Sequence, residues 1–319
     1  MVSDILKKSV ILSIIVPVYN EEKTIPFFLE SIKKVMADIT ENYEIIFALD
    51  PCSDKTEELI ENAHSNDPRI KLLRFSRRFG QPSATWAGLH YASGDAVVPI
   101  DCDMQDPPEL INEMVRLWKE EGYKVVIPQR ISRKGENILK KIISYTGYWF
   151  INKTAIVNIP RNTGDFRLLD RTVVNELLKL NESHGFLRGL TSLVGFRTKL
   201  LPFNRLARLD GKGKYNRITG SLKIGFNGIV AFSDYLLNLI TMIGFLFSFV
   251  SISGAFFLII TKLFGLRDYA SGIATLGVAI FFLFSIQFLA LGVMGAYISR
   301  IYDEVKRRPK FIVEKTIGF

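Results

Sequence analysis

The sequence has few of the residues that build disulfide frameworks or zinc sites. Its 319 residues include 2 cysteines and 3 histidines, and Cys52 and Cys102 each follow a strand-like apolar run. A disulfide framework is therefore not indicated. The sequence also lacks zinc-finger spacing, an RNP motif and a continuous basic helix, so nucleic-acid binding does not explain its net charge of +9. We expect no nucleic-acid partner.

Glycine-rich phosphate-binding motifs are also absent. No G-x-G-x-x-G follows the first strand-like run, and no G-x-x-x-x-G-K-[ST] occurs in the chain. The usual dinucleotide and P-loop sites are therefore excluded. The apolar stretch Val10–Val18 is short, contains Pro17 and lacks a small-residue cleavage site, so we expect no signal peptide.

Charged residues are almost missing from Leu236–Ile260 and Ile273–Ile298. Each stretch is long enough to cross a hydrocarbon layer of about 30 Å as a helix, and neither keeps a charged face. We expect two transmembrane helices joined by the short link Thr261–Gly272; the alternative is a buried hairpin in a soluble protein. The basic residues that flank the two stretches are Arg217, Lys223, Arg300, Lys306, Arg307, Arg308 and Lys310. They predict that both termini are cytoplasmic and that the membrane-proximal segments attract anionic lipid.

Strand-like and helical segments alternate in the first half of the chain. The expected strands are Ser13–Val18, Tyr43–Leu49, Ile70–Phe75, Asp95–Asp101 and Tyr123–Ile127; the expected helices are Thr24–Met36, a helix capped by Ser53 or Asp54, Pro82–Ala92 and a helix from Glu109. This order predicts a Rossmann-like, doubly wound and mainly parallel α/β sheet. We assign residues 1–215 to this domain, 216–234 to an interfacial helix, and 235–319 to the hairpin with its basic cytoplasmic tail. A core helix of the soluble domain is the alternative for Ile218–Phe232.

Acidic residues follow the expected strands. Asp101 and Asp103 stand one residue apart directly after an apolar run, and Glu21 and Asp50 hold similar positions. Open α/β sheets build their ligand sites at the carboxyl ends of their strands, and paired carboxylates suit Mg²⁺ or Mn²⁺ held largely through substrate phosphates. A solvated loop or a helix cap is the alternative for any one of these residues.

Basic residues gather at two places that would meet an anionic substrate. Arg130 begins the first group, in which Lys140 and Ser144 would share one helix face. We interpret this group as a site for an anionic headgroup at the membrane interface, against the alternative of a solvated surface. Arg208 and Lys214 belong to the second group, on a glycine-containing loop. This loop is either a lid over an anionic substrate or a mobile surface turn.

Taken together, the motifs resemble those of family-2 glycosyltransferases of GT-A fold. They are Pro17-Val18-Tyr19-Asn20-Glu21, Asp50 with Ser53-Asp54-Lys55-Thr56, Arg77 with Phe79-Gly80, Asp101-x-Asp103-x-Gln105-Asp106-Pro107-Pro108-Glu109, Asn162 to Arg171, Arg188-Gly189 and Val194 to Arg197. With the two apolar stretches, the chain is similar over nearly its whole length to bacterial polyprenyl-phosphate glycosyltransferases of the GtrB type, relatives of dolichol-phosphate mannose synthase. It departs from their pattern at Pro51-Cys52, at Arg78 with Gln81, and at Gly213.

The resemblance implies a role for each group of site residues. The nucleotide-sugar would be bound by Pro17, Tyr19, Glu21, Asp50 and Asp101, and the metal ion by Asp101, Asp103 and Gln105. The residues at the reaction centre would be Asp165, Arg167 and Asp103. The lipid phosphate would be bound by Arg130, Lys140, Ser144, Arg208 and Lys214. Asp165 would act as a base, orient Arg167 or hold the geometry; we favour orientation, because a lipid phosphate is already largely ionised at neutral pH.

The resulting hypothesis is an inverting, Mg²⁺- or Mn²⁺-dependent transfer of one sugar from a nucleotide-sugar to undecaprenyl or dolichyl phosphate. The enzyme would lie in the cell membrane, in bacteria the inner one, with its catalytic domain in the cytoplasm. UDP-glucose is the favoured donor, ahead of UDP-N-acetylhexosamine and GDP-mannose. A processive polysaccharide synthase is disfavoured because no Gln-x-x-Arg-Trp motif occurs; a non-catalytic membrane scaffold or nucleotide-sugar sensor is the third hypothesis. Gly292 and Ala296 offer a packing face for the hairpin or for a homo-oligomer.

Overall fold

The structure is a computed structural model that describes residues 12–131, 160–180, 187–204 and 273–319, with Met242, Leu246, Phe249, Ile260 and Phe264. The chain divides into two compact units. The α/β unit consists of Met1–Tyr148, Val157–Gly220 and Arg307–Phe319, and the helical unit of Trp149–Ile156 and Ser221–Lys306.

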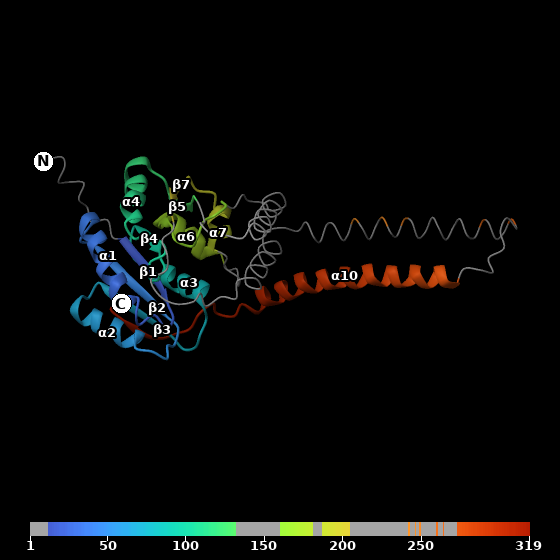
Figure 1. The fold of residues 1–319 in the computed structure, drawn as a ribbon, viewed down its shortest axis with the longest axis horizontal. Helices are drawn as coiled ribbons and strands as arrows, with labels where there is room; N and C mark the ends of the chain where they lie inside the picture. Colours follow the sequence, from blue (N-terminus) through green and yellow to red (C-terminus); the bar gives the residue numbers. More distant parts are fainter. Residues whose placement is uncertain are drawn as a thin grey trace. The chain divides into compact units, whose positions relative to one another are not determined.

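An eight-stranded sheet of order β7-β5-β6-β4-β1-β2-β3-β8 forms the α/β unit (Figure 1). Its strands are β1 (Leu12–Val18), β2 (Tyr43–Leu49), β3 (Ile70–Phe75), β4 (Ala96–Pro99), β5 (Val125–Arg130), β6 (Leu168–Asp170), β7 (Thr198–Phe203) and β8 (Val313–Ile317). β1 pairs in parallel with β2 and β4, β2 with β3, and β5 with β7. β6 runs antiparallel to both β4 and β5, and β8 runs antiparallel to β3. The mainly parallel sheet that the sequence predicted is confirmed, and it fits the GT-A type.

Helices cover both faces of this sheet. The unit contains α1 (Ile25–Ile39), α2 (Thr56–Asn66), α3 (Gln81–Tyr91), α4 (Leu110–Glu121), α6 (Arg171–Lys179) and α7 (Leu187–Leu193). Ile14 and Val16 of β1 lie in one core with Phe28 of α1, whereas Ile15 between them meets Gly88 of α3. Successive side chains of a strand point to opposite faces, so a central strand between two helical layers needs consecutive apolar residues such as Ile14, Ile15 and Val16 of β1.

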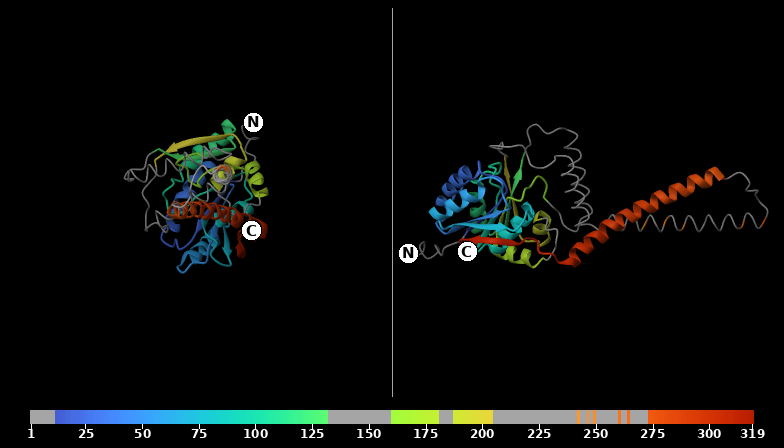
Figure 2. Two further views of the ribbon diagram at one scale, coloured as in Figure 1. Left: turned by 90° about the vertical axis from the view of Figure 1, so that its right-hand side faces the viewer. Right: turned by 90° about the horizontal axis from the view of Figure 1, so that it is seen from below.

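β8 completes the edge of the sheet beside β3 (Figure 2). Phe311, just before β8, has its ring centroid 6.2 Å from that of Phe75 in β3. Lys310 Nζ lies 4.0 Å from the centroid of the Trp86 ring in α3, and Glu314 forms an ion pair with Arg74. The residues that follow α10 (Ile273–Lys306) therefore belong to the α/β unit and extend its sheet, which the sequence analysis did not anticipate.

Asp170 joins β6, α4 and α6. Its Oδ1 accepts a hydrogen bond from the Thr172 backbone N–H at 2.9 Å, while Oδ2 accepts from Trp118 Nε1 at 2.7 Å and from Lys124 Nζ at 2.9 Å. Burial by itself would raise the pKa of this carboxyl, but these donors lower it to about 2. The side chain is therefore a buried, fully bonded carboxylate at neutral pH.

Asp170→Asn is expected to lower the free energy of unfolding at pH 7 by about 2 kcal/mol. The folded pKa lies below the unfolded value, so this stability is present above about pH 4 and is lost as the pH falls towards 2. Urea unfolding of the whole chain in detergent at pH 7, 4 and 3 measures it. Glu176→Gln, which removes an exposed ion pair with Lys179 on the same helix, serves as the control. An equal loss at pH 7 and pH 3 would contradict the assignment.

The described part of the helical unit is dominated by α10 (Ile273–Lys306), a helix of 34 residues. It covers the second expected transmembrane stretch; the first stretch and the expected interfacial helix lie almost wholly outside the described residues. Across the part of the chain that can be described, no helix combines the length and apolarity needed to span a membrane. Membrane crossing and the Gly292 packing face both stay predictions.

Candidate active site

A small pocket lies at the carboxyl ends of β1 and β4. It is lined by Pro17, Gln81, Thr85, Pro99, Ile100, Asp101, Asp165 and Phe166. Three of these residues, Pro17, Asp101 and Asp165, are site residues that the sequence analysis named. The structure thus brings together parts of three distant motifs at the edge where open α/β sheets bind ligands.

The acidic turn after β4 forms one wall of this region. Asp101 Oδ1 accepts a hydrogen bond from Gln81 Nε2 at 2.7 Å. Asp103 is buried, and its Oδ1 accepts from the Gln105 backbone N–H at 3.0 Å. Met104 between them has φ +58°, a left-handed conformation that costs energy in a residue with a side chain. The turn therefore carries backbone strain at Met104, and both carboxylates accept hydrogen bonds.

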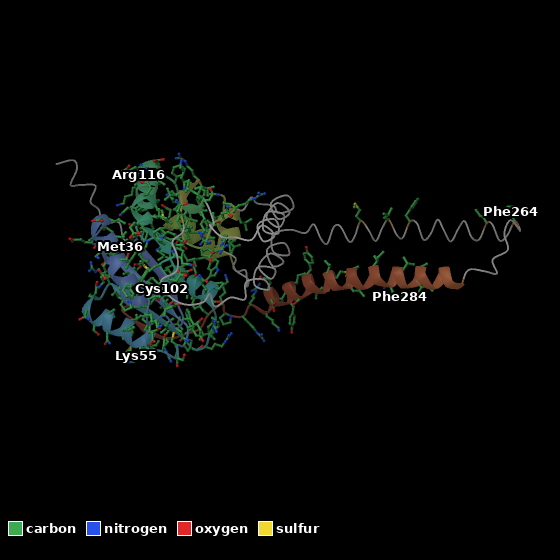
Figure 3. All side chains as sticks on the ribbon, in the orientation of Figure 1. Met36, Lys55, Cys102, Arg116, Phe264 and Phe284 are labelled. Atoms are coloured by element: carbon green, nitrogen blue, oxygen red, sulfur yellow. The ribbon has the colours of Figure 1, made fainter. Side chains whose placement is uncertain are left out.

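The charges around this turn favour a cation. Burial raises the pKa of the Cys102 thiol, and the negative charges of Glu21, Asp101 and Asp103 raise it further; Figure 3 shows Cys102 inside the α/β unit. In the described ranges no group of three or more His, Cys, Asp or Glu side chains is arranged to hold a metal ion. Two carboxylates fit Mg²⁺ or Mn²⁺ that takes its remaining oxygen ligands from a diphosphate and water.

Asp50 is engaged with the backbone of the loop that leads into α3. Its Oδ1 accepts from the Phe79 N–H at 2.8 Å and its Oδ2 from the Gly80 N–H at 3.0 Å. Gly80 has φ +87°, which a glycine adopts without strain. Asp50 thereby fixes the turn that places Gln81 beside Asp101.

Two other predicted nucleotide ligands, Tyr19 and Glu21, do not line the pocket. The guanidinium of Arg78 lies 4.0 Å from the centroid of the Tyr19 ring. Glu21 Oε2 accepts a hydrogen bond from Thr24 Oγ1 at 2.9 Å. Nucleotide binding by Tyr19, Glu21 and Asp50 stays a prediction.

Asp165 is held on the pocket wall by Arg188 of α7. Arg188 Nε donates to Asp165 Oδ1 at 2.9 Å, and Nη2 lies 3.5 Å from Oδ2. Desolvation opposes the charged form of Asp165, but the charges of Arg188, Arg167 and Arg130 lower its pKa overall. Asp165 is therefore a carboxylate at neutral pH.

Arg167 lies fully buried behind this pair. Its Nη2 donates to the Gly164 carbonyl oxygen at 2.6 Å, while Nε and Nη1 find no hydrogen-bond partner among the described residues. Burial lowers the pKa of Arg167 to about 10, an effect that Asp165 opposes and Arg188 reinforces. Asp165 orients Arg188 by direct contact, whereas its influence on Arg167 is electrostatic.

Arg130 stands at the end of β5, where its Nη2 lies 3.4 Å from Asp106 Oδ1. A Cβ added to Gly164 would lie 3.1 Å from the same nitrogen, so Arg130 is next to the segment that carries Asp165. The other four predicted lipid-phosphate ligands lie outside the described residues: Lys140, Ser144, Arg208 and Lys214.

The sequence analysis did not assign roles to Gln81 and Arg188. Gln81 was named there only as a departure from the family pattern, and Arg188 stood in a quoted motif without a partner. Their contacts join residues 20 and 23 positions apart in the chain, and such pairings require the fold.

Comparison with known proteins gives a consistent family assignment. Residues 13–178 match the family model of glycosyl transferase family 2. The chain is 44% identical to an uncharacterized glycosyltransferase of Bacillus subtilis, with 96% of this chain and 94% of that protein covered. It is 38% identical to the SfII prophage-derived bactoprenol glucosyl transferase of Shigella flexneri, covering 96% and 98%. It is 36% identical to the prophage bactoprenol glucosyl transferase homolog of Escherichia coli, covering 95% and 98%.

Proposed function

The chain belongs to glycosyl transferase family 2, and from this premise we propose that it transfers a single sugar, glucose by preference, from a nucleotide-sugar to a polyprenyl phosphate. The observation that carries the proposal is the pocket that joins Asp101 to Asp165. Support for the acceptor and for glucose comes from the relatives named bactoprenol glucosyl transferases, to which the chain is similar over nearly its whole length.

Asp101 and Asp103 act on the donor side. Together with Gln105 nearby, they would hold Mg²⁺ or Mn²⁺, which when bound supplies positive charge to the departing diphosphate. Gln81 orients Asp101 through its 2.7 Å hydrogen bond, and the Gln105 backbone orients Asp103. The protein thereby presents both carboxylates in fixed positions, which reduces reorganisation during the reaction.

The acceptor needs little activation. A phosphate monoester has a second pKa of about 6 and is largely ionised at neutral pH, so positioning dominates. One phosphate oxygen forms a bond to the anomeric carbon while the bond to the diphosphate oxygen breaks on the opposite face, which inverts the configuration. Because the pKa of Asp165 is lowered, this carboxylate is a weak base and serves as a fixed negative charge beside the sugar. Arg130 approaches the lipid phosphate with Lys140 and Ser144.

The acceptor also requires contact with a bilayer. We propose that the helical unit is a two-helix membrane anchor in the cell membrane, with the catalytic unit on its cytoplasmic side. Two observations support this: residues 273–298 carry no charged side chain, and Leu276, Leu291 and Ile298 are each more than half exposed. In a bilayer these side chains would lie against lipid tails that are as apolar as they are, so their exposure to water would be avoided.

The test incubates the purified whole chain with undecaprenyl phosphate, Mg²⁺ or Mn²⁺ and, in separate reactions, UDP-glucose, UDP-N-acetylglucosamine and GDP-mannose. We expect a glucosyl-phosphate lipid and UDP, detected by mass spectrometry of the lipid extract, with at least tenfold less product from the other donors. A polymeric product would favour a processive synthase. Absence of product with every donor, from protein that still binds nucleotide, would favour a sensor or scaffold.

A further inference from the structure

The contact between Arg188 and Asp165 restricts the orientation of the Asp165 carboxylate as well as neutralising its charge. Two nitrogens of the guanidinium face the two oxygens of the carboxylate, at 2.9 Å and 3.5 Å. Side-on pairing of this kind restricts both side chains more than a single contact does. Asp165 comes from the loop before β6 and Arg188 from α7, so the pair also ties two separate elements together at the pocket.

The neighbourhood of Asp165 is dominated by cations. Arg188 contacts it directly, Arg167 lies buried behind it, and Arg130 approaches the adjacent Gly164. Asp106 pairs with Arg130, and Asp101 lies on the wall of the same pocket. Arg167 donates its hydrogen bond to the Gly164 carbonyl oxygen. Among the described residues, Arg188 is the cation that contacts the Asp165 carboxylate directly.

We propose that Arg188 is a positioning residue for sugar transfer, and that its guanidinium holds the Asp165 carboxylate in one orientation on the pocket wall. The inference rests on the proposed transfer reaction. Arg188 acts through Asp165, so its contribution appears in turnover rather than in substrate affinity. It has two separable parts: the positive charge, which keeps Asp165 ionised, and the side-on geometry, which aims it.

Two variants separate these parts. Arg188→Gln removes the charge and the pairing; Arg188→Lys keeps the charge but cannot present two parallel N–H groups. We expect kcat to fall about 30-fold in Arg188→Gln and about 5-fold in Arg188→Lys, with KM for donor and acceptor changed less than about threefold. Arg116→Gln on α4, which removes an exposed arginine paired with Glu113 at 2.7 Å (Figure 3), should match the wild type.

The pH profile gives a readout that a purely structural role would not change. Arg188 lowers the pKa of Asp165, so the loss of its charge lets Asp165 become protonated at higher pH. This adds a loss of kcat on the acidic side to the one that protonation of the acceptor phosphate causes near about pH 6. We expect an upward shift of at least about half a pH unit in Arg188→Gln and no comparable shift in Arg188→Lys. An unchanged limb in Arg188→Gln, or a loss confined to KM, would overturn the inference.

A second measurement does not need catalysis and keeps the two proposals separate. Unfolding midpoints are measured for wild type, Arg188→Gln, Asp165→Asn and the double variant at pH 7. We expect Arg188→Gln to lower the midpoint markedly in the wild-type background and much less in Asp165→Asn. If the cycle shows coupling but no donor in the panel gives product, the transfer reaction is rejected and the pairing of Arg188 with Asp165 stands. Equal losses in both backgrounds would reject the pairing as the function of Arg188.

Discussion

Asp103→Asn is expected to lower kcat/KM for sugar transfer by at least about 10²-fold, since one of two carboxylates that offset the charge of a bound cation is lost. The change keeps the shape of the side chain and an oxygen that can still accept the hydrogen bond from the Gln105 N–H. Folding should therefore be nearly unchanged. Initial rates over a range of Mn²⁺ concentrations measure the effect, and the Mn²⁺ concentration at half-maximal rate should rise.

Asp95→Asn is the matched control for this experiment. Asp95 is exposed and directly precedes β4, at the opposite end of the strand that leads to Asp103. It should retain wild-type rates and metal dependence. A wild-type rate in Asp103→Asn would remove the metal assignment. A parallel loss in Asp95→Asn would show that the strand, rather than the carboxylate, is responsible.

Gly88→Ala is expected to destabilise the protein by about 2 kcal/mol. A Cβ at this position would lie 2.2 Å from Cγ2 and 2.9 Å from Cγ1 of Ile15. Ile15 belongs to a central strand and is β-branched, so it has little freedom to turn aside. Overpacking costs roughly 3 kcal/mol in such a core, and the better helix propensity of alanine returns about 1 kcal/mol. α3 must shift away from β1, and with it Gln81 and Thr85 of the pocket.

A compensating change in the strand tests this explanation. Ile15→Ala removes the atoms that the new methyl group would strike, although it is itself destabilising. Gly88→Ala should therefore cost clearly less in the Ile15→Ala background than in the wild type, as measured by urea unfolding. Equal costs in the two backgrounds would show that the contact with Ile15 is not the reason. Transfer activity should follow the same order.

The central half of the fold could be predicted because its signals are local. β2 and β3 have the predicted bounds, and β1 starts one residue earlier than expected. β4 ends at Pro99 rather than at Asp101, because the chain turns there into the acidic loop. The second helix begins at Thr56, and the flanking Lys55 provides no side-chain cap. Asp54, one of the two expected caps, accepts a hydrogen bond from the Thr56 N–H at 3.1 Å.

The outer strands could not be predicted from local patterns. β6 has only 3 residues, and its place between β4 and β5 depends on antiparallel pairing with distant segments. β7 is largely exposed, with a mixed burial pattern. β8 reads Val-Glu-Lys-Thr-Ile after a strongly basic stretch. Its charged residues Glu314 and Lys315 pair with Arg74 of β3 and Glu61 of α2. In each case the partner strand supplies the reason for the structure.

The candidate site, like the fold, could be predicted from the sequence only in part. The motifs predicted Pro17, Asp101 and Asp165, and these residues share one pocket. They did not predict that Asp50 would bind the backbone N–H groups of Phe79 and Gly80. Motifs identify which side chains carry chemistry, whereas the contacts that orient those side chains come from other elements of the fold.

Because β8 is the last element of the chain, the sheet can be completed only at the end of translation. The strand that closes the sheet next to β3 is encoded after α10, so the ribosome must deliver that long helix before the catalytic sheet can be finished. Until then, β3 presents unpaired N–H and C=O groups, the kind of edge that invites aggregation. A polypeptide truncated after α10 would therefore contain every pocket residue but would leave the edge of β3 unpaired. We expect chaperones and proteases to bind such a polypeptide.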